Sequence, residues 1–357
     1  MIPVTKTSLP PFGEYCAEIR KCWDSHILTN MGEEHEAFRA ALEAFLPCPH
    51  VSLFTNGHLA LEAALAALDL PPGGEVITTP YTFVSTTHAI ARKGLVPVFC
   101  DVRAEDATMD PSCIEALITD KTVAILPVHV YGHVCDVDAI GEIAARHGLK
   151  LLYDAAHAIG VRYRGVPAVS FGDASVLSFH ATKVFSTIEG GAVCSTDGRI
   201  AAFLDDEKNF GIRGPESCVS AGGNAKMSEF QAAMGLCNLR HFDEVLEKRK
   251  VLTERYLSRL EGRVRILSPR EGVTPNYAYM PVLMPGRDAA FQRLAAQGIA
   301  ARKYFYPLTS AVPCYAPSAA QTPMAASLAE QVLCLPLYPD LPPEEVDRIC
   351  AVLTGEK

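Results

Sequence analysis

Hydrophobic positions along the chain fall into short apolar runs separated by longer segments with apolar residues at helical spacing. Between about Val51 and Thr196 the apolar runs are nearly continuous, as in strands that are covered on both faces. Seven runs of this kind can be read in order: VSLF, EVITT, VPVFCDV, AILPVHVYG, LKLLYD, ASVLSF and GAVCST. Strands that alternate with helices predict a mainly parallel sheet with right-handed crossovers.

Helical spacing predicts the segments that join and follow these strands. Helices are expected over residues 57–68, 82–93, 111–118 and 137–147, and a longer one runs from about 227 to 260. The third begins with Pro111 at its first turn, and the last begins near Ser228. The remaining chain has its own strand, YAYMPVLM, and two helices, RDAAFQRLAAQG and PPEEVDRICAVL. We therefore predict an α/β protein with a large domain over 1–244, including an N-terminal segment, and a small C-terminal α+β domain over 245–357.

Size and composition support a globular protein with two domains. The chain has 357 residues, of which 49% are hydrophobic and 20% charged, and this length exceeds what one small core needs. The net charge of −9, without a long basic run, argues against binding to nucleic acid or to an anionic membrane. A small anionic substrate stays possible, because local basic residues can outweigh the net sign.

Targeting and cysteine patterns indicate a cytoplasmic protein. The opening MIPVTKTSLPPFGEY lacks the basic and then apolar layout of a signal peptide. The most apolar stretch, LALEAALAALDL, is interrupted by Glu62 and Asp69 and is too short to span a bilayer. Twelve cysteines occur singly, without a C-x-x-C pair, which argues against a zinc site and a disulfide framework. A reducing compartment fits best.

Lys183 is unusual because it stands in the uncharged stretch LSFHATKVFSTIEGGAVCST. No Asp, Glu, Arg or other Lys lies within five positions on either side, and Glu189 is the nearest. The apolar flanks predict strands, so the lysine is expected between buried strands, where an ammonium group is costly. Such a lysine is either paired or has a lowered pKa and serves as a nucleophile.

Two further polar clusters follow predicted strands, and open parallel sheets bind ligands beyond the carboxyl ends of their strands. Asn56 and Gly57 turn the chain into a helix, whose first amides offer a phosphate site; the alternative is a plain strand-to-helix turn. Asp154 ends an apolar strand and is followed by His157. Asp154 either caps a helix or faces a cationic ligand. It lies 29 positions before Lys183, a spacing that can bring both to one edge of the sheet.

A phosphate site, an acidic residue and a buried lysine together suit pyridoxal 5′-phosphate (PLP). Lys183 would hold the aldehyde as a Schiff base, and Asp154 would keep the pyridine nitrogen protonated so that the ring accepts electrons. Phe83 would supply a flat face over the ring, although a core aromatic is an equal alternative.

The stretch from Tyr153 to Thr196 resembles the signature of the DegT/DnrJ/EryC1/StrS family of sugar aminotransferases. Four other stretches are similar to the same family: PVFCDV, PVHVYGHVCDVDAI, GGNAKMSEFQAAMGL and LPLYPDLPPEEVDRI. The resemblance covers nearly the whole chain. It implies the fold-type I architecture, with a mainly parallel seven-stranded sheet in a large PLP-binding domain, and it implies PLP as the cofactor.

The resemblance also implies residue roles. Lys183 matches the Schiff-base lysine and Asp154 the partner of the pyridine nitrogen. Other matches are His157 to the contact with the cofactor's 3-hydroxyl, Ser178 and the amides of Gly57 and His58 to the phosphate ligands, and Phe83 to the stacking aromatic. Asn224 matches an asparagine that reaches the phosphate of the neighbouring subunit, which implies a homodimer with shared active sites. Two positions depart from the family pattern, because His58 replaces a usual Thr and Thr309 replaces a usual His.

The implied reaction moves the amino group of L-glutamate, which leaves as 2-oxoglutarate, to a nucleotide-linked keto sugar. Within the family, LTNMG, TTHAI, HVYGHVCDVDAI and LSFHATK are most similar to enzymes that form dTDP-4-amino-4,6-dideoxyglucose from the 4-keto-6-deoxy sugar. Another nucleotide sugar, 3-keto or linked to UDP or GDP, is the alternative. A related sugar dehydratase has histidine at the lysine position, so Lys183 argues against it. A PLP-binding regulator without turnover would not need the complete catalytic set.

A nucleotide sugar brings two negative charges to a protein of net charge −9, so local basic groups are needed. Lys226 and Arg213 are the candidates, and His180 and Tyr306 are expected to add neutral hydrogen bonds. The alternative for Lys226 and Arg213 is an ordinary solvated surface.

Overall fold

The large sheet lies at the centre of the protein, and we describe it from a computed structural model that covers residues 1–315 and 321–356. Its seven strands run in the order β1-β9-β8-β5-β4-β2-β3. Their bounds are β1 His50–Phe54, β2 Glu75–Thr78, β3 Val96–Phe99, β4 Thr122–Leu126, β5 Lys150–Asp154, β8 Ala174–Ser178 and β9 Gly191–Ser195. Only β9 runs antiparallel to its neighbours, β1 and β8. The predicted mainly parallel seven-stranded sheet is therefore confirmed.

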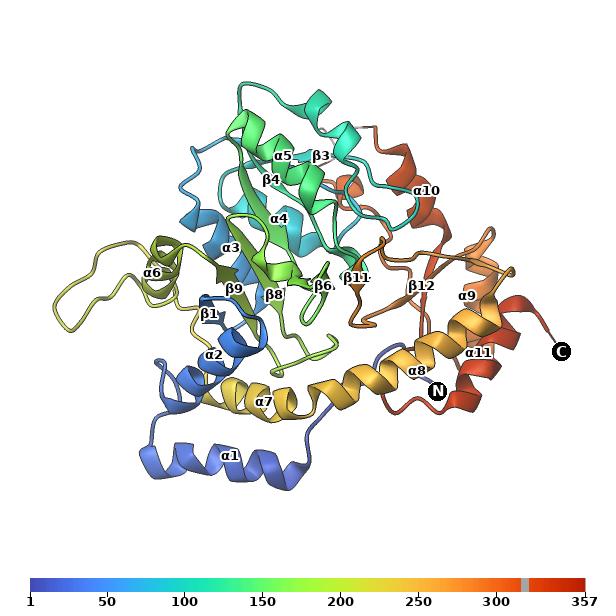
Figure 1. The fold of residues 1–357 in the computed structure, drawn as a ribbon, viewed down its shortest axis with the longest axis horizontal. Helices are drawn as coiled ribbons and strands as arrows, with labels where there is room; N and C mark the ends of the chain where they lie inside the picture. The colour runs from blue at the N-terminus through green and yellow to red at the C-terminus, as the bar shows by residue number, and fades with distance from the viewer. Residues whose placement is uncertain (316–320, 357) are drawn as a thin grey trace.

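Helices cover both faces of this sheet (Figure 1). One face packs against α3 Gly57–Ala67, α4 Val84–Arg92 and α6 Gly198–Glu207, through small residues such as Ala60 and Ala64. The other face packs against α2 Glu33–Phe45, α5 Val137–His147 and α7 Glu229–Arg240, with Phe38 and Leu42 fully buried. Because both faces are covered, the strands read as continuous apolar runs rather than alternating ones.

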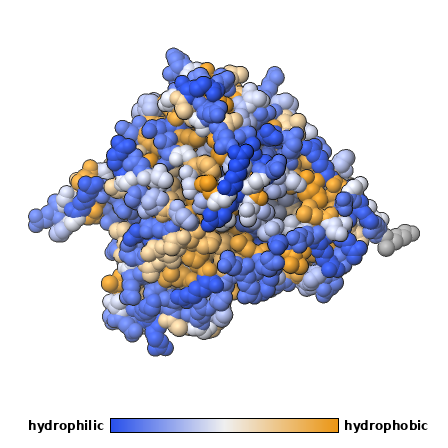
Figure 2. All heavy atoms as spheres, viewed as in Figure 1, coloured by the Kyte–Doolittle hydropathy of each residue, from blue (hydrophilic) through white to orange (hydrophobic). Residues whose placement is uncertain are grey.

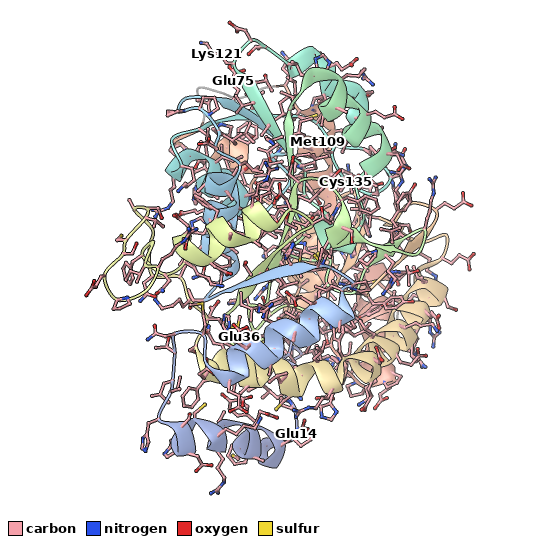
Figure 3. All side chains as sticks on the ribbon, turned by 60° about the vertical axis from the view of Figure 1, so that its left-hand side comes forward. Glu14, Glu36, Glu75, Met109, Lys121 and Cys135 are labelled. Atoms are coloured by element: carbon pink, nitrogen blue, oxygen red, sulfur yellow. The ribbon has the colours of Figure 1, made fainter. Side chains whose placement is uncertain are left out.

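Two helical predictions were wrong in detail. Residues 111–118 form two short 3-10 turns, Pro111–Cys113 and Glu115–Leu117, whose amides bond to carbonyls three residues earlier, such as Ile114 to Pro111 and Leu117 to Ile114. The long segment is two helices, α7 and α8 Phe242–Leu260, with a break at His241. His241 binds Glu14 of α1 Phe12–Ser25 at 2.7 Å, and Figure 3 shows Glu14 on α1 below α7.

The C-terminal part has its own core around Leu252, Tyr256 and Val346. Its elements are β10 Arg265–Ile266, β12 Met280–Leu283, α9 Arg287–Ala296, α10 Pro323–Gln331, β13 Val332–Leu335 and α11 Pro343–Thr354. A third sheet joins β11 Val273–Thr274 to β6 Arg162–Tyr163 and β7 Val166–Pro167. The chain passes between the two parts along α8, which begins two residues before the predicted division at 244/245. That division stays a prediction.

The surface of the protein, its cysteines and its helices were each compared with the expectations from the sequence. The face shown in Figure 2 is largely hydrophilic around its rim, and its hydrophobic residues gather in a central band. All twelve cysteines lie in the described ranges and carry free thiols, and Cys135 lies in the interior (Figure 3). Among the helices described, none is both long and apolar enough to cross a bilayer.

Candidate active site

A cavity of about 780 Å³ opens beyond the carboxyl ends of β5 and β8. The register pairs Asp154 with Val176, so Asp154 and Ser178 end neighbouring strands and both line the cavity. The first turns of α3 and α4 form a second wall, and the segment 302–305 forms a third. The cavity therefore lies where the sequence predicts ligand binding and also uses residues from the C-terminal part.

The turn into α3 forms a tight cup that only glycine fits. The Asn56 side chain accepts a hydrogen bond from the Leu59 amide at 2.9 Å, which leaves the first amides of the helix, those of Gly57 and His58, for a ligand. A Cβ on Gly57 would lie 2.9 Å from Cβ of Ser178, and one on Gly191 would lie 2.7 Å from the Gly57 nitrogen. This close approach places two amides and the Ser178 hydroxyl together, which suits a phosphate.

Asp154 is buried at the floor of the cavity. Its Oδ2 accepts a hydrogen bond from the Thr86 hydroxyl at 2.7 Å, and its Oδ1 accepts one from the Ala156 amide at 3.0 Å. Burial raises the pKa of Asp154, while these hydrogen bonds and the charge of Lys183 act in the opposite direction. The element that follows Asp154 is the short strand β6 Arg162–Tyr163 and not an α-helix, so the alternative of a helix cap is wrong. A buried carboxylate of this kind suits a cationic ligand such as a protonated ring nitrogen.

Lys183 lies half-buried on the cavity wall, in the loop that joins β8 to β9. Phe179 and Phe185 anchor the loop in the core, with ring centroids 5.3 Å apart. The amide of Phe179 donates to the carbonyl of Gly190, and that of Lys183 to the carbonyl of His180, each at 2.8 Å. Desolvation lowers the pKa of Lys183 to about 8, and the nearby Asp154 partly opposes this. A substantial fraction of the amine is therefore neutral near pH 8, as a nucleophile requires.

This pKa predicts how the cofactor-free protein reacts with added PLP. The rate of attachment should rise about tenfold per pH unit below 8 and level off above it, because only the neutral amine attacks. Asp154→Asn removes the charge that supports the ammonium form, so the midpoint should move to lower pH. Stopped-flow absorbance over pH 6–11 measures both curves. A midpoint near 10.5, the ordinary value for lysine, would show that Lys183 is not desolvated.

His157 is held in one orientation by the backbone. Its Nδ1 accepts a hydrogen bond from the Tyr131 amide at 3.1 Å, and its carbonyl accepts one from Asn276 at 2.8 Å. The ring lies 4.8 Å from Tyr279 and 6.0 Å from Phe305, between centroids. Burial lowers the pKa of His157, so the ring is neutral and its proton is on Nε2. This tautomer gives the cavity a hydrogen-bond donor for a ligand oxygen.

Phe83, His58 and Thr309 have different surroundings. Phe83 is 55% exposed and lines the cavity, so it is not a core aromatic and its ring is free to stack on a ligand. The His58 ring binds Ser85 at 2.8 Å and Glu62 at 3.1 Å, which leaves its amide for the phosphate. Thr309 is buried and its hydroxyl accepts from Thr87 and donates to the Pro80 carbonyl. It is therefore a packing residue and not a cavity contact.

Among the residues predicted to contact the substrate, His180 lines this cavity. Within the described chain, four other predicted site residues do not line it: Arg213, Asn224, Lys226 and Tyr306. The segment 209–224 projects from the body between α6 and α7 (Figure 1). Asn224 lies at its base, where it pairs with Asn209, and Lys226 follows it and pairs with Phe54 of β1. Arg213 is exposed on the same segment and paired with Asp206. The ring of Tyr306 lies 4.6 Å from the guanidinium carbon of Arg287, and its hydrogen bond to the substrate stays a prediction.

Sequence reasoning missed the C-terminal wall of the cavity, made by Tyr279, Arg302, Tyr304 and Phe305. It also missed Thr86, which binds Asp154. Thr86 could have been found from the sequence, because it lies in the first turn of a helix that follows a strand, where ligands are expected to bind. The others lie more than 90 positions after Lys183 and reach the cavity only by packing of the C-terminal part.

The residues present fit PLP. The glycine cup and Ser178 suit its phosphate, Asp154 suits its ring nitrogen, and the Nε2 proton of His157 suits its phenolic oxygen. Lys183 is an amine of lowered pKa in the same cavity, as covalent attachment of an aldehyde requires.

Comparisons with known proteins agree with this geometry. The profile of the DegT/DnrJ/EryC1/StrS aminotransferase family matches residues 13–354. The chain is 41% identical to a dTDP-4-amino-4,6-dideoxy-D-glucose transaminase of Escherichia coli, over 99% of this chain and 98% of the relative. It also resembles the structure of DesI with its TDP-sugar product, with a TM-score of 0.94 and 32% identity over 99% of this chain and 92% of the other. The PLP-form of a protein described as a sugar aminotransferase from Streptococcus pneumoniae gives 0.92 and 26% over 98% and 97%.

Proposed function

Since the chain belongs to the DegT/DnrJ/EryC1/StrS aminotransferase family and is a PLP-dependent nucleotide-sugar aminotransferase, we propose that it aminates dTDP-4-keto-6-deoxy-D-glucose with L-glutamate. The products are dTDP-4-amino-4,6-dideoxy-D-glucose and 2-oxoglutarate. The proposal rests on the observation that Lys183 and Asp154 line the same cavity. In addition, a relative that is 41% identical is named as a transaminase of this sugar.

Each cavity residue has a task in this reaction. Bound there, PLP supplies a ring that accepts electrons and makes the α-hydrogen of the amino donor acidic. The amides of Gly57 and His58 and the hydroxyl of Ser178 bind its phosphate. Asp154 would hold a proton at the ring nitrogen, and Phe83 would supply a flat apolar surface for the ring.

Lys183 is the group that moves protons. Its Nζ accepts the proton that leaves the α-carbon of glutamate, and in the second half of the reaction it returns a proton to the sugar carbon that receives the amine. One amine performs both tasks because the loop anchored by Phe179 and Phe185 holds it beside the reacting atoms. The aromatic wall of Tyr279, Tyr304 and Phe305 limits water access during the transfer.

A panel of nucleotide sugars tests the substrate. The holoenzyme is mixed with glutamate and with 4-keto or 3-keto sugars linked to dTDP, UDP or GDP, and 2-oxoglutarate release is measured. We expect the highest kcat/KM for dTDP-4-keto-6-deoxy-D-glucose. A higher kcat/KM for a 3-keto sugar or for another base would contradict this choice but not the aminotransferase activity.

We further propose a homodimer in which the projecting segment of each chain reaches the other chain's cavity. This segment exposes three large apolar side chains, Phe210, Ile212 and Val219, which an isolated chain leaves in water. Val219→Asp should therefore shift the protein toward monomer in analytical ultracentrifugation and lower its activity. Val251→Asp is the matched control, since both valines are 51% exposed but Val251 lies on α8. A monomer with full activity would exclude shared sites.

In that dimer, Lys226 is the stronger candidate for binding the nucleotide sugar. Burial lowers its pKa, and its ammonium lies 5.0 Å from the Phe210 ring centroid, whereas Arg213 is already paired with Asp206. Lys226→Ala should raise KM for the nucleotide sugar about 2- to 5-fold, with less effect on KM for glutamate and a smaller effect at high salt. Arg213→Ala should raise KM for the nucleotide sugar by a smaller factor. Equal changes in both KM values would indicate damage to the cofactor site instead.

A further inference from the structure

Arg302 is a positive charge on the cavity wall that the reaction described above does not use. Its backbone pairs with Cys334 of β13 in both directions, at 3.1 and 2.8 Å, so the C-terminal part fixes its position. Its Nη1 donates to the hydroxyl of Tyr304 at 2.8 Å, and its guanidinium carbon lies 5.2 Å from the Tyr304 ring centroid. The side chain is thus half-buried and held by one aromatic neighbour.

The charge of Arg302 lacks an acidic partner. Among the other charged groups that line the cavity, Asp154 faces Lys183, and Glu189 lies 3.5 Å from His180. Within residues 1–315 and 321–356, no carboxylate forms an ion pair with Arg302. A guanidinium has five N–H donors in a planar fork, and Tyr304 accepts only one of them. The remaining donors match a planar anion such as a carboxylate.

The position of Arg302 connects it to the reacting centre. Tyr304 packs on Tyr279 at 6.3 Å, and Tyr279 packs on His157 at 4.8 Å, between ring centroids. Burial raises the pKa of Tyr279, and the charges of Arg249 and Arg302 partly oppose this rise, so Arg302 lies near enough to act on this wall. The charge therefore acts on the side of the cavity where His157 offers its proton.

The two substrates of an aminotransferase occupy one cavity in turn, and they differ in charge. Glutamate carries both carboxylates within a few bonds of its reacting carbon, so they must lie inside the cavity. A nucleotide sugar places a neutral ring there, and its phosphates lie beyond that ring. Guanidinium donors bind carboxylate oxygens strongly and can also donate to sugar hydroxyls, so one arginine serves both states.

We propose that Arg302 binds a carboxylate of the amino-acid substrate. This rests on the proposed use of glutamate, and it assigns to the C-terminal part the recognition of the donor. The nucleotide sugar, in contrast, depends on the projecting segment of the other chain.

The test measures ligand binding to the PLP-loaded protein by calorimetry, with glutarate and dTDP as probes. Glutarate has two carboxylates and no amino group, so it binds without turnover. Arg302→Met should raise its Kd about 10- to 100-fold, as loss of a charged hydrogen-bonded pair does, and should leave the Kd of dTDP within about twofold. Lys303→Met is the matched control, because Lys303 pairs with Asp288 at 2.7 Å and is not among the described residues that line the cavity.

The outcomes separate the assignments. Weaker dTDP binding with unchanged glutarate binding would overturn the proposal and place Arg302 on the nucleotide side. No change in either Kd would also overturn it and leave Arg302 as a support for Tyr304. If Arg302→Met does not fold, Arg302→Gln keeps an N–H donor for Tyr304, and the same change is expected. Failure of the unaltered enzyme to use glutamate would contradict the proposed donor, while glutarate binding would still test Arg302.

Discussion

Lys183→Ala should lower the rate of amino transfer by about 10⁴-fold or more, because it removes the group that we propose binds the cofactor covalently and moves the protons. The folded structure should persist, since the loop is anchored by Phe179 and Phe185 rather than by the lysine. Borohydride reduction followed by peptide mass spectrometry should find the cofactor on the peptide with Lys183 in the unaltered protein and on none in the variant. Added methylamine should restore part of the rate.

Lys121→Ala is the control for this experiment. Lys121 is an exposed lysine just before β4, at the end of the sheet away from the cavity (Figure 3). Its loss should change neither the rate nor the labelled peptide. Near-normal turnover by Lys183→Ala, or cofactor on another lysine in the unaltered protein, would contradict the assignment.

Asp154→Asn should lower the rate of amino transfer by about 10²- to 10⁴-fold while the protein still binds some cofactor. The amide has the shape of the carboxylate and can still accept from Thr86 and Ala156, so the cavity should keep its form. It has no charge, however, and cannot hold the ring nitrogen protonated. Single-turnover kinetics with glutamate measure the loss in the first half of the reaction, separately from any change in cofactor affinity.

Asp197→Asn is the matched control, because Asp197 caps α6 and pairs with the exposed Arg199. That variant should keep its rate. An unchanged rate in Asp154→Asn would mean that the carboxylate only orders the turn after β5.

The sheet and its chemistry could be predicted because they depend on local patterns. Apolar runs covered on both faces identify the strands, and polar residues directly after such runs identify the edge where ligands bind. Asp154, Ser178 and Gly57 belong to this class. Lys183 was recognisable because it stands between two apolar runs and lacks charged neighbours. Such a lysine is expected to be buried in the folded chain.

The residues that sequence reasoning missed depend on long-range packing. Arg302 and Tyr304 reach the cavity because the C-terminal part folds back over α4, and no local spacing records this contact. The break at His241 is similar, since the residue at the break bonds to Glu14 near the other end of the chain. His58 was recognised as a departure, but its bonds to Ser85 and Glu62 depend on the packing of α3 against α4.

The most direct test of the central claim follows the nitrogen atom. Purified holoenzyme is incubated with ¹⁵N-labelled L-glutamate and dTDP-4-keto-6-deoxy-D-glucose, and the nucleotide sugar is analysed by mass spectrometry and NMR. The account predicts ¹⁵N on carbon 4 of the sugar and one 2-oxoglutarate per amino sugar. A sugar that returns without nitrogen, or one that loses a hydroxyl instead, while the protein is folded and loaded with PLP, would contradict it.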